Sequence, residues 1–235
     1  MDNDASLSAQ PRRTRRIVLV VLAVLAMASA VFVVRRPLMM SVPMCTSGRW
    51  HGCFGTFNGV ALMTVAALPL AALAVWALAR CRSVTGSTPA RVWRVSLAEV
   101  AMVYGTVPWV WMIMLPGDEA GAVISLVPLR DLLAMDTGQV VGNLLVFAAL
   151  GFFAPLRFSA LASVPRILAL GVGCSVLVEA AQYVLRLDRV SSVDDILLNS
   201  AGAGLAALAS RRWWRATAGA SSDRPRPGPS RVVPR

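Results

Sequence analysis

The sequence contains no lysine and only one histidine, and charged residues make up 15% of its 235 residues. Soluble domains carry about 25% charged residues, so this deficit indicates a surface that largely faces lipid. The four cysteines form no CxxC pair and no His/Cys cluster with zinc spacing. Nucleotide-binding loops, GxSxG elbows and HExxH motifs are also absent, which argues against familiar NTPases and hydrolases. We therefore expect neither a cofactor nor a bound metal ion.

Apolar residues, in contrast, make up 57% of the chain and are concentrated in long runs. A membrane-spanning helix needs roughly 20 mainly apolar residues. Six segments meet this requirement: Ile17–Val34, Gly59–Ala79, Val95–Leu115, Gln139–Leu156, Arg166–Leu185 and Val193–Ser210. The sequence thus predicts an all-α, polytopic transmembrane helix bundle of about six helices. The first segment resembles a signal peptide, but its apolar run continues past the candidate cleavage site, so we expect an uncleaved anchor.

The arginines predict the orientation, because cytoplasmic segments of membrane proteins are enriched in basic residues. With the N-terminus inside, 17 of the 23 arginines fall in cytoplasmic segments. Both termini are then cytoplasmic, which is an N-in and C-in topology. The net charge of +11 is spread over loops and tails rather than one face, so we expect membrane lipids as partners and no nucleic acid.

This topology divides the chain into four parts. Residues 1–16 form an Arg-rich cytoplasmic tail, and residues 17–115 form a three-helix membrane region with an outside loop at 35–58. A second membrane domain covers residues 125–214. Residues 216–235 are rich in proline and arginine, and we expect a disordered cytoplasmic tail there.

The outside loop carries two of the cysteines and the single histidine. Cys45 and Cys53 would lie in an oxidising compartment, where a disulfide between them is expected; two free thiols are the alternative. His51 lies between them, and a single histidine without further ligands is expected to be an ordinary polar loop residue.

Polar side chains within the last three spans are the candidate functional residues. An ionisable side chain inside a membrane costs about 2.5–3.5 kcal/mol on insertion scales, so each one needs a reason to be there. The predicted topology puts these side chains at similar depths in the outer leaflet, and their spacing puts each set on one helix face. We call this group the polar cluster: Asn143, Glu179, Gln182, Arg189, Asp195 and Asn199. Glu179 and Asp195 are the catalytic candidates, and the alternative is that the cluster only joins helices.

Two further predictions concern packing within the bundle. Small residues allow helices to approach closely, and five glycines are expected to serve this purpose: Gly138, Gly142, Gly151, Gly202 and Gly204. Glu99, near the cytoplasmic end of the third span, has no evident partner in the sequence. We therefore expect it to be structural, with its carboxylate reaching toward the interface.

Three segments resemble motifs of the VanZ-like family in order and spacing. Asn143–Gly151, which reads NLLVFAALG, resembles the NLLLFxPLG-type motif, and Glu179–Gln182 resembles the ExxQ motif. The stretch Arg189–Gly202 resembles the RxxxxxDxxxNxxG motif. The resemblance covers roughly Ser125–Trp214, and it departs from the family at Ala149, where a proline is usual.

The resemblance implies a multi-pass protein of the bacterial plasma membrane that acts in the cell envelope. The family is named after a teicoplanin-resistance protein, which implies a glycopeptide or lipopeptide antibiotic response, or an action on a lipid-linked wall component. One alternative is a membrane enzyme that uses Glu179 or Asp195 as acid or base, with Arg189 binding the phosphate of a lipid-linked substrate. The second alternative is a small-solute transporter, although the first three helices do not repeat the polar pattern.

Overall fold

A computed structural model of the chain describes residues 39–84, 88–117 and 123–222, together with isolated residues between 21 and 35. The predicted N-terminal tail, most of the first predicted span and residues 223–235 lie outside the described residues. The chain divides into two units, Met1–Ala66 and Ala67–Arg235, which are described separately below.

The first unit contains short helices where the sequence suggested an outside loop. Residues 39–46 are helical, and α3 (Trp50–Phe54) and α4 (Phe57–Ala66) follow. A disulfide joins Cys45 in the first of these helical segments to Cys53 in α3, with 5.5 Å between the two Cα atoms. Cys53 is buried. The disulfide therefore ties two consecutive helical segments together, and the alternative of two free thiols does not describe this structure.

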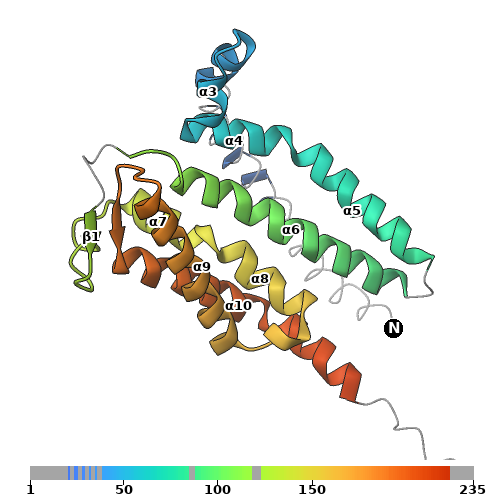
Figure 1. Cartoon of the computed structure of the whole chain (residues 1–235). Helices are drawn as coiled ribbons and strands as arrows, with labels where there is room; N and C mark the ends of the chain where they lie inside the picture. Colours follow the sequence, from blue (N-terminus) through green and yellow to red (C-terminus); the bar gives the residue numbers. More distant parts are fainter. Residues whose placement is uncertain are drawn as a thin grey trace, which may run out of the picture. The chain divides into compact units, whose positions relative to one another are not determined.

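The second unit is a helix bundle, so the predicted all-α class is confirmed. Its helices are α5 (Leu68–Ser83), α6 (Pro89–Ile113), α7 (Thr137–Val146), α8 (Ala148–Arg157), α9 (Val164–Val184) and α10 (Val193–Ser222), with a 3-10 turn at Ser159–Leu161. Within this unit α5 lies along α6, while α10 lies against α7, α8 and α9 (Figure 1). Proline occupies one of the first two positions of α5, α6 and α9, where its missing N–H costs no helical hydrogen bond.

Small residues allow α10 to occupy the centre of this bundle. A Cβ atom placed on Gly202 would overlap the backbone carbonyl of Leu144 in α7, and one placed on Gly151 in α8 would overlap the carbonyl of Ala203. These two glycines therefore let the backbones of α7 and α8 touch α10 directly. Gly204 lies against the side chain of Leu168 on α9.

The other two glycines do not pack between helices as predicted. Around a Cβ placed on Gly142, no described atom lies within 4 Å, and the atom nearest to a Cβ on Gly138 belongs to Asp136 of the same helix start. Asp136 caps α7 by accepting the N–H groups of Gly138 and Gln139. Gly138 thus belongs to a helix cap, and its spacing from Gly142 is not used for packing.

In the part of the chain that the structure describes, three helical stretches are long and apolar enough to cross a membrane: Pro89–Ile113, Thr137–Arg157 and Val164–Val184. The consecutive helices α4 and α5 count as a fourth if they form one broken span. These stretches correspond to the second to fifth predicted spans. The sixth predicted span lies within α10, which is less apolar because alanine, glycine and acidic residues replace larger side chains. Six spans and the N-in orientation therefore stay predictions.

Two helix boundaries differ from those expected. The fourth predicted span is broken at Phe147, which is neither in α7 nor in α8 and whose side chain is buried in the core. The side chain of Phe147 packs into the core at the break, and the break occurs with Ala149 in place of the proline that the family motif usually has there. In addition, α10 continues to Ser222, so residues 216–222, which were expected to be disordered, are helical. Alternating alanines at the end of α10 explain this, since alanine is the best helix former.

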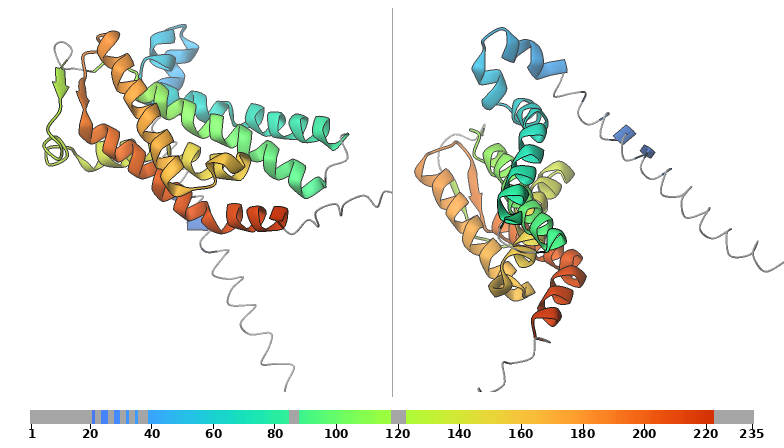
Figure 2. Two further views of the ribbon diagram at one scale, coloured as in Figure 1. Left: turned by 60° about the horizontal axis from the view of Figure 1, so that its bottom comes forward. Right: turned by 90° about the vertical axis from the view of Figure 1, so that its right-hand side faces the viewer.

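A small sheet distinguishes the two ends of the second unit. β1 (Val123–Ser125) pairs in parallel with β2 (Val190–Ser192), and Ser125 lies opposite Ser192. The sheet lies at the end where α6 and α9 stop and α7 and α10 begin, which we call the sheet end (Figure 2). The last turns of α5 and α8 lie at the opposite end, which we call the arginine end.

Candidate functional site

Two serines fix the start of α10 at the sheet end. The hydroxyl of Ser192 accepts the backbone N–H of Asp194 at 3.1 Å, as a helix N-cap does, and donates to Oδ2 of Asp131 at 2.6 Å. Hydrogen bonds from Ser125 and Ser192 hold the pKa of the Asp131 carboxyl below its usual value. The neighbouring Ser191 donates its hydroxyl to the backbone carbonyl of Glu179 at 3.2 Å. The β2 strand thus connects α9, α10 and the segment before α7.

Asp194 organises that segment from inside the protein. Its carboxylate is 1% exposed and accepts the backbone N–H groups of Leu129 at 2.6 Å, Asp131 at 2.9 Å and Leu132 at 2.9 Å. Hydrogen bonds to a charged acceptor are roughly twice as strong as neutral ones. Leu129 has a positive φ of 65°, which lets the chain curl around the carboxylate. Asp194 therefore positions the segment, a role that its place in the first turn of α10 made hard to foresee.

Glu179 lies beneath the start of α10 and is only 8% exposed. Its Oε2 atom accepts the backbone N–H of Ser192 at 3.2 Å. Asp195 and Arg189 are both close enough to act on the Glu179 carboxyl electrostatically. The structure thus brings Glu179, Arg189 and Asp195 into one electrostatic neighbourhood, formed by the end of α9, the following turn and the start of α10.

Asn143 and Asp195 form the one direct hydrogen bond found between members of the polar cluster within the described residues. The Nδ2 atom of Asn143 in α7 donates to Oδ1 of Asp195 in α10. Both residues are half-buried, so their side chains are reachable in a way that the buried Glu179 is not. This contact places an amide and a carboxylate side by side at the accessible edge of the cluster.

The remaining three members of the polar cluster have other partners. Gln182 donates to the backbone carbonyl of Ile113 at 2.7 Å, and Arg189 donates to the carbonyl of Leu115 at 3.4 Å, so both attach α9 and its turn to the end of α6. Within the described structure, Arg189 forms no ion pair with Glu179 or Asp195.

Asn199 lies deeper in the bundle and pairs with α9. Its Nδ2 atom donates to the hydroxyl of Ser175 at 2.8 Å, and both side chains are fully buried. The Oδ1 atom of Asn199 has no hydrogen-bond partner among the described atoms. Such an acceptor is costly when buried, so this position is suited to a water molecule or to a polar group of a ligand.

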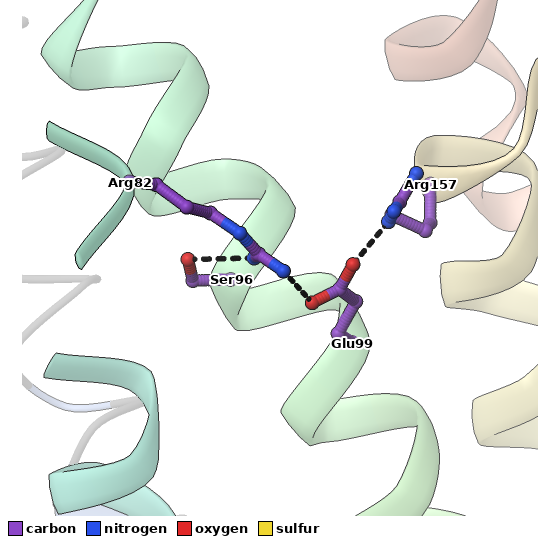
Figure 3. Close-up of polar contacts among 4 residues, drawn as sticks. All are labelled: Arg82, Ser96, Glu99 and Arg157. Carbon is purple, nitrogen blue, oxygen red and sulfur yellow. Dashed lines mark hydrogen bonds and ion pairs between the residues drawn. The ribbon is translucent and has the colours of Figure 1, made fainter. Parts of the chain in front are cut away.

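A second polar network lies at the arginine end, where the sequence suggested no partner for Glu99 (Figure 3). The Glu99 carboxylate in α6 pairs with Nη2 of Arg82 at 2.5 Å and with Nε of Arg157 at the end of α8. Arg82 also donates through Nη1 to the buried hydroxyl of Ser96 at 3.0 Å. We call these four residues the arginine node, and it joins α5, α6 and α8.

The described part of the chain contains no group of three or more His, Cys, Asp or Glu side chains that could hold a metal ion. The candidate chemistry rests on Glu179, Asp195, Asn143 and Arg189. A carboxyl can bind a cation or exchange a proton, and an arginine can bind a phosphate or carboxylate. Sequence reasoning missed the serines that hold these groups; the signal was a serine directly before an acidic first helical turn.

Comparison with protein families gives one match, and comparisons with curated proteins and with solved structures give none. Residues 100–214 match the family model described as VanZ/LLP1. This range begins earlier than the resemblance seen in the motifs, so it includes most of α6 as well as α7 to α10. All six residues of the polar cluster fall within it. The chain therefore carries a VanZ-like domain, VanZ/LLP1, at residues 100–214.

Proposed function

We propose that this VanZ-like protein acts in the bacterial cell envelope. In this proposal it crosses the plasma membrane several times, with both termini in the cytoplasm and the sheet end facing outward. The polar cluster then binds the polar part of an amphiphile in the outer leaflet, either a lipid-linked wall component or a glycopeptide or lipopeptide antibiotic. The observation that carries the proposal is the group formed by Glu179, Asp195 and Arg189 beside the half-buried Asn143.

The arrangement supports binding better than it supports simple helix joining. Interhelical hydrogen bonds within membranes contribute about 0.6 kcal/mol on average, and uncharged amides provide them as well as carboxylates do. Two carboxylates near one another carry a larger burial cost, about 2.5–3.5 kcal/mol each on insertion scales. Glu179 and Asp195 therefore suit a role that needs charge or a titrating proton.

A membrane enzyme is the second candidate function. Glu179 or Asp195 would act as a general acid or base on a lipid-linked substrate, and Arg189 would bind its phosphate. In its favour, Arg189 lies close enough to Glu179 to act on it electrostatically, and among the described residues its guanidinium makes one long hydrogen bond of 3.4 Å, to the carbonyl of Leu115. A small-solute transporter is the third candidate, and the cluster at only one end of the bundle offers it less support.

The substitution Glu179→Gln tests the proposal, because it keeps size and hydrogen bonding but removes the charge. Strains would carry a deletion, the wild-type chain, Glu179→Gln, or the control Asp188→Asn, which changes an exposed carboxylate in the neighbouring turn. We expect the deletion and Glu179→Gln to change sensitivity to teicoplanin-type glycopeptides or to lipopeptides, with normal protein levels in the membrane. The control should behave as wild type.

Two outcomes would contradict the proposal. If the deletion changes sensitivity to neither class of antibiotic and does not alter lipid-linked wall precursors, the envelope role is wrong. If the deletion has an effect but Glu179→Gln complements it fully, the cluster serves only to join helices. An enzyme would be recognised by a lipid-linked product that accumulates with the wild-type chain and not with Glu179→Gln.

A further inference from the structure

The end of β1 and the segment that follows it toward α7 expose a series of large apolar side chains. We call residues 124–134 the apolar loop; its exposed members are Ile124, Leu126, Val127, Leu129 and Leu133. Leu126 is 72% exposed and Leu133 is 89% exposed, which is unusual for leucine in a loop that meets water. This surface needs an explanation that the polar cluster does not give.

Many backbone N–H groups of the apolar loop are hydrogen-bonded within the protein. Asp194 accepts three of its N–H groups, as described above, and further N–H groups donate to carbonyls of the loop itself, namely Arg130 to Val127 and both Ala134 and Met135 to Asp131. Pro128 has no N–H to satisfy. At the start of the loop, β1 pairs with β2. A loop in water does not require such internal hydrogen bonds for its N–H groups. Irregular backbone in lipid does require them, because lipid offers no hydrogen bonds.

The placement of the charged residues in the apolar loop also fits contact with lipid. Its two ionisable residues are Arg130 and Asp131. Asp131 receives a hydrogen bond from Ser192 and is thus turned toward the protein. Arg130 is exposed, and a long arginine side chain at an interface can extend its guanidinium to water while its stem stays in lipid. The outer surface of the loop is therefore apolar except for one residue that tolerates an interface.

The position of the loop connects it to the membrane. It follows α6 and precedes α7, and both helices belong to stretches that are long and apolar enough to span a bilayer. A chain that crosses the bilayer in both stretches leaves it near Ile113 and enters it again near Thr137, so the connection that contains the loop begins and ends close to the membrane surface. The apolar surface of the loop is in this way continuous with the lipid-facing surface of the bundle.

We propose that the apolar loop inserts into the lipid–water interface of the membrane at the sheet end, with Leu126 and Leu133 in contact with lipid and Asp194 holding the backbone in shape. The occupant of this surface is the bilayer itself. The proposal needs only that the chain spans a membrane, and it holds whether or not the polar cluster acts in the envelope.

Site-directed spin labelling of the full chain tests the insertion. The background would be Cys81→Ser with Cys174→Ser, because these are the free cysteines of the described chain, and labelling without reductant leaves the disulfide intact. A nitroxide would be placed at Leu126→Cys or Leu133→Cys, and the protein reconstituted in vesicles of phosphatidylethanolamine and phosphatidylglycerol. Accessibility to oxygen, which partitions into lipid, is compared with accessibility to a water-soluble nickel chelate.

Two labels at other positions calibrate the measurement. Leu177→Cys lies on an exposed face within α9, and Arg186→Cys lies in the exposed turn at the sheet end. We expect the labels at Leu126 and Leu133 to favour oxygen over the nickel chelate, the reverse of the Arg186 label, with an apparent depth between the two controls.

Three results would overturn the proposal. Nickel accessibility equal to that of the Arg186 label would mean that the loop lies in water. Low accessibility to both reagents together with spin–spin broadening between copies would mean that a second copy of the chain covers the loop. Low accessibility to both without broadening would mean that another part of the same chain covers it.

Discussion

The arginine node gives the sharpest test of how charge stabilises this bundle. Glu99 pairs with Arg82 and Arg157 at once, and the side chains are 22%, 32% and 34% exposed, respectively. The substitution Glu99→Gln keeps the shape and one acceptor oxygen but removes the negative charge. Two guanidinium groups from α5 and α8 would then face each other without the carboxylate that lies between them. We therefore expect the variant to unfold more easily.

The expected loss in the free energy of unfolding of Glu99→Gln lies between two limits. Exposed ion pairs contribute about 0.2–1 kcal/mol, whereas removing one partner of a fully buried pair costs about 3–5 kcal/mol. The three charged side chains are 22–34% exposed, so solvent screens each pair substantially, but two pairs are lost together. We expect Glu99→Gln to lower the free energy of unfolding by about 2 kcal/mol, a value between these limits.

The assay is denaturant unfolding of the full chain in lipid nanodiscs, followed by tryptophan fluorescence. Arg94→Gln is the matched control, because Arg94 is an exposed arginine on the same helix as Glu99. The double variant Glu99→Gln with Arg157→Gln should recover part of the loss, because it removes one of the two cations that faced the carboxylate. The electrostatic explanation is wrong if Glu99→Gln is as stable as the control. It is also wrong if the double variant is less stable than the wild type by the full sum of the two single effects.

Three further predictions follow from the topology, the packing and the loop anchor. Reporter fusions after Arg82 and after Gly117 should report inside and outside, and the opposite pattern would contradict the proposed orientation. Gly202→Val should lower the free energy of unfolding by about 1–3 kcal/mol or more because it overlaps the α7 backbone, whereas Gly142→Val should change it by about 0.5 kcal/mol or less; equal effects would contradict the packing. Asp194→Asn should raise hydrogen exchange at the amides of the apolar loop, measured by mass spectrometry, with unchanged membrane levels; wild-type protection would show that the carboxylate charge is not needed.

Composition and hydropathy predicted the helical class and the approximate positions of the longest helices. The third and fifth predicted spans, Val95–Leu115 and Arg166–Leu185, overlap α6 and α9, which begin earlier than predicted and end one or two residues sooner. The earlier starts were also predictable, since proline stands at the start of both helices. The break at Phe147 was not, because an apolar residue at a helix break looks the same in a hydropathy pattern as one within a helix.

Side-chain partners were less predictable than helices. Glu99 finds two partners from helices that are distant in the sequence, and hydropathy carries no information on which loop arginines reach back to a carboxylate. Asp194 and Asp195 are adjacent, yet Asp194 binds backbone N–H groups while Asp195 binds Asn143. Successive positions on a helix point about 100° apart, so neighbours along the chain face different surroundings. Only the fold decides which of the two carboxylates is an anchor and which is available.

The two polar networks differ in how their charge is balanced, and this difference favours a functional role for only one of them. At the arginine end, a single carboxylate is paired with two cations, which is the composition of a structural connection between helices. At the sheet end, Glu179 and Asp195 have one nearby cation, Arg189, and within the described residues no carboxylate there forms an ion pair. Folding alone would favour replacing such groups with amides, since an unpaired buried charge is costly. A carboxylate pair that persists without full compensation is better explained by a cation, a proton or a polar ligand that completes it.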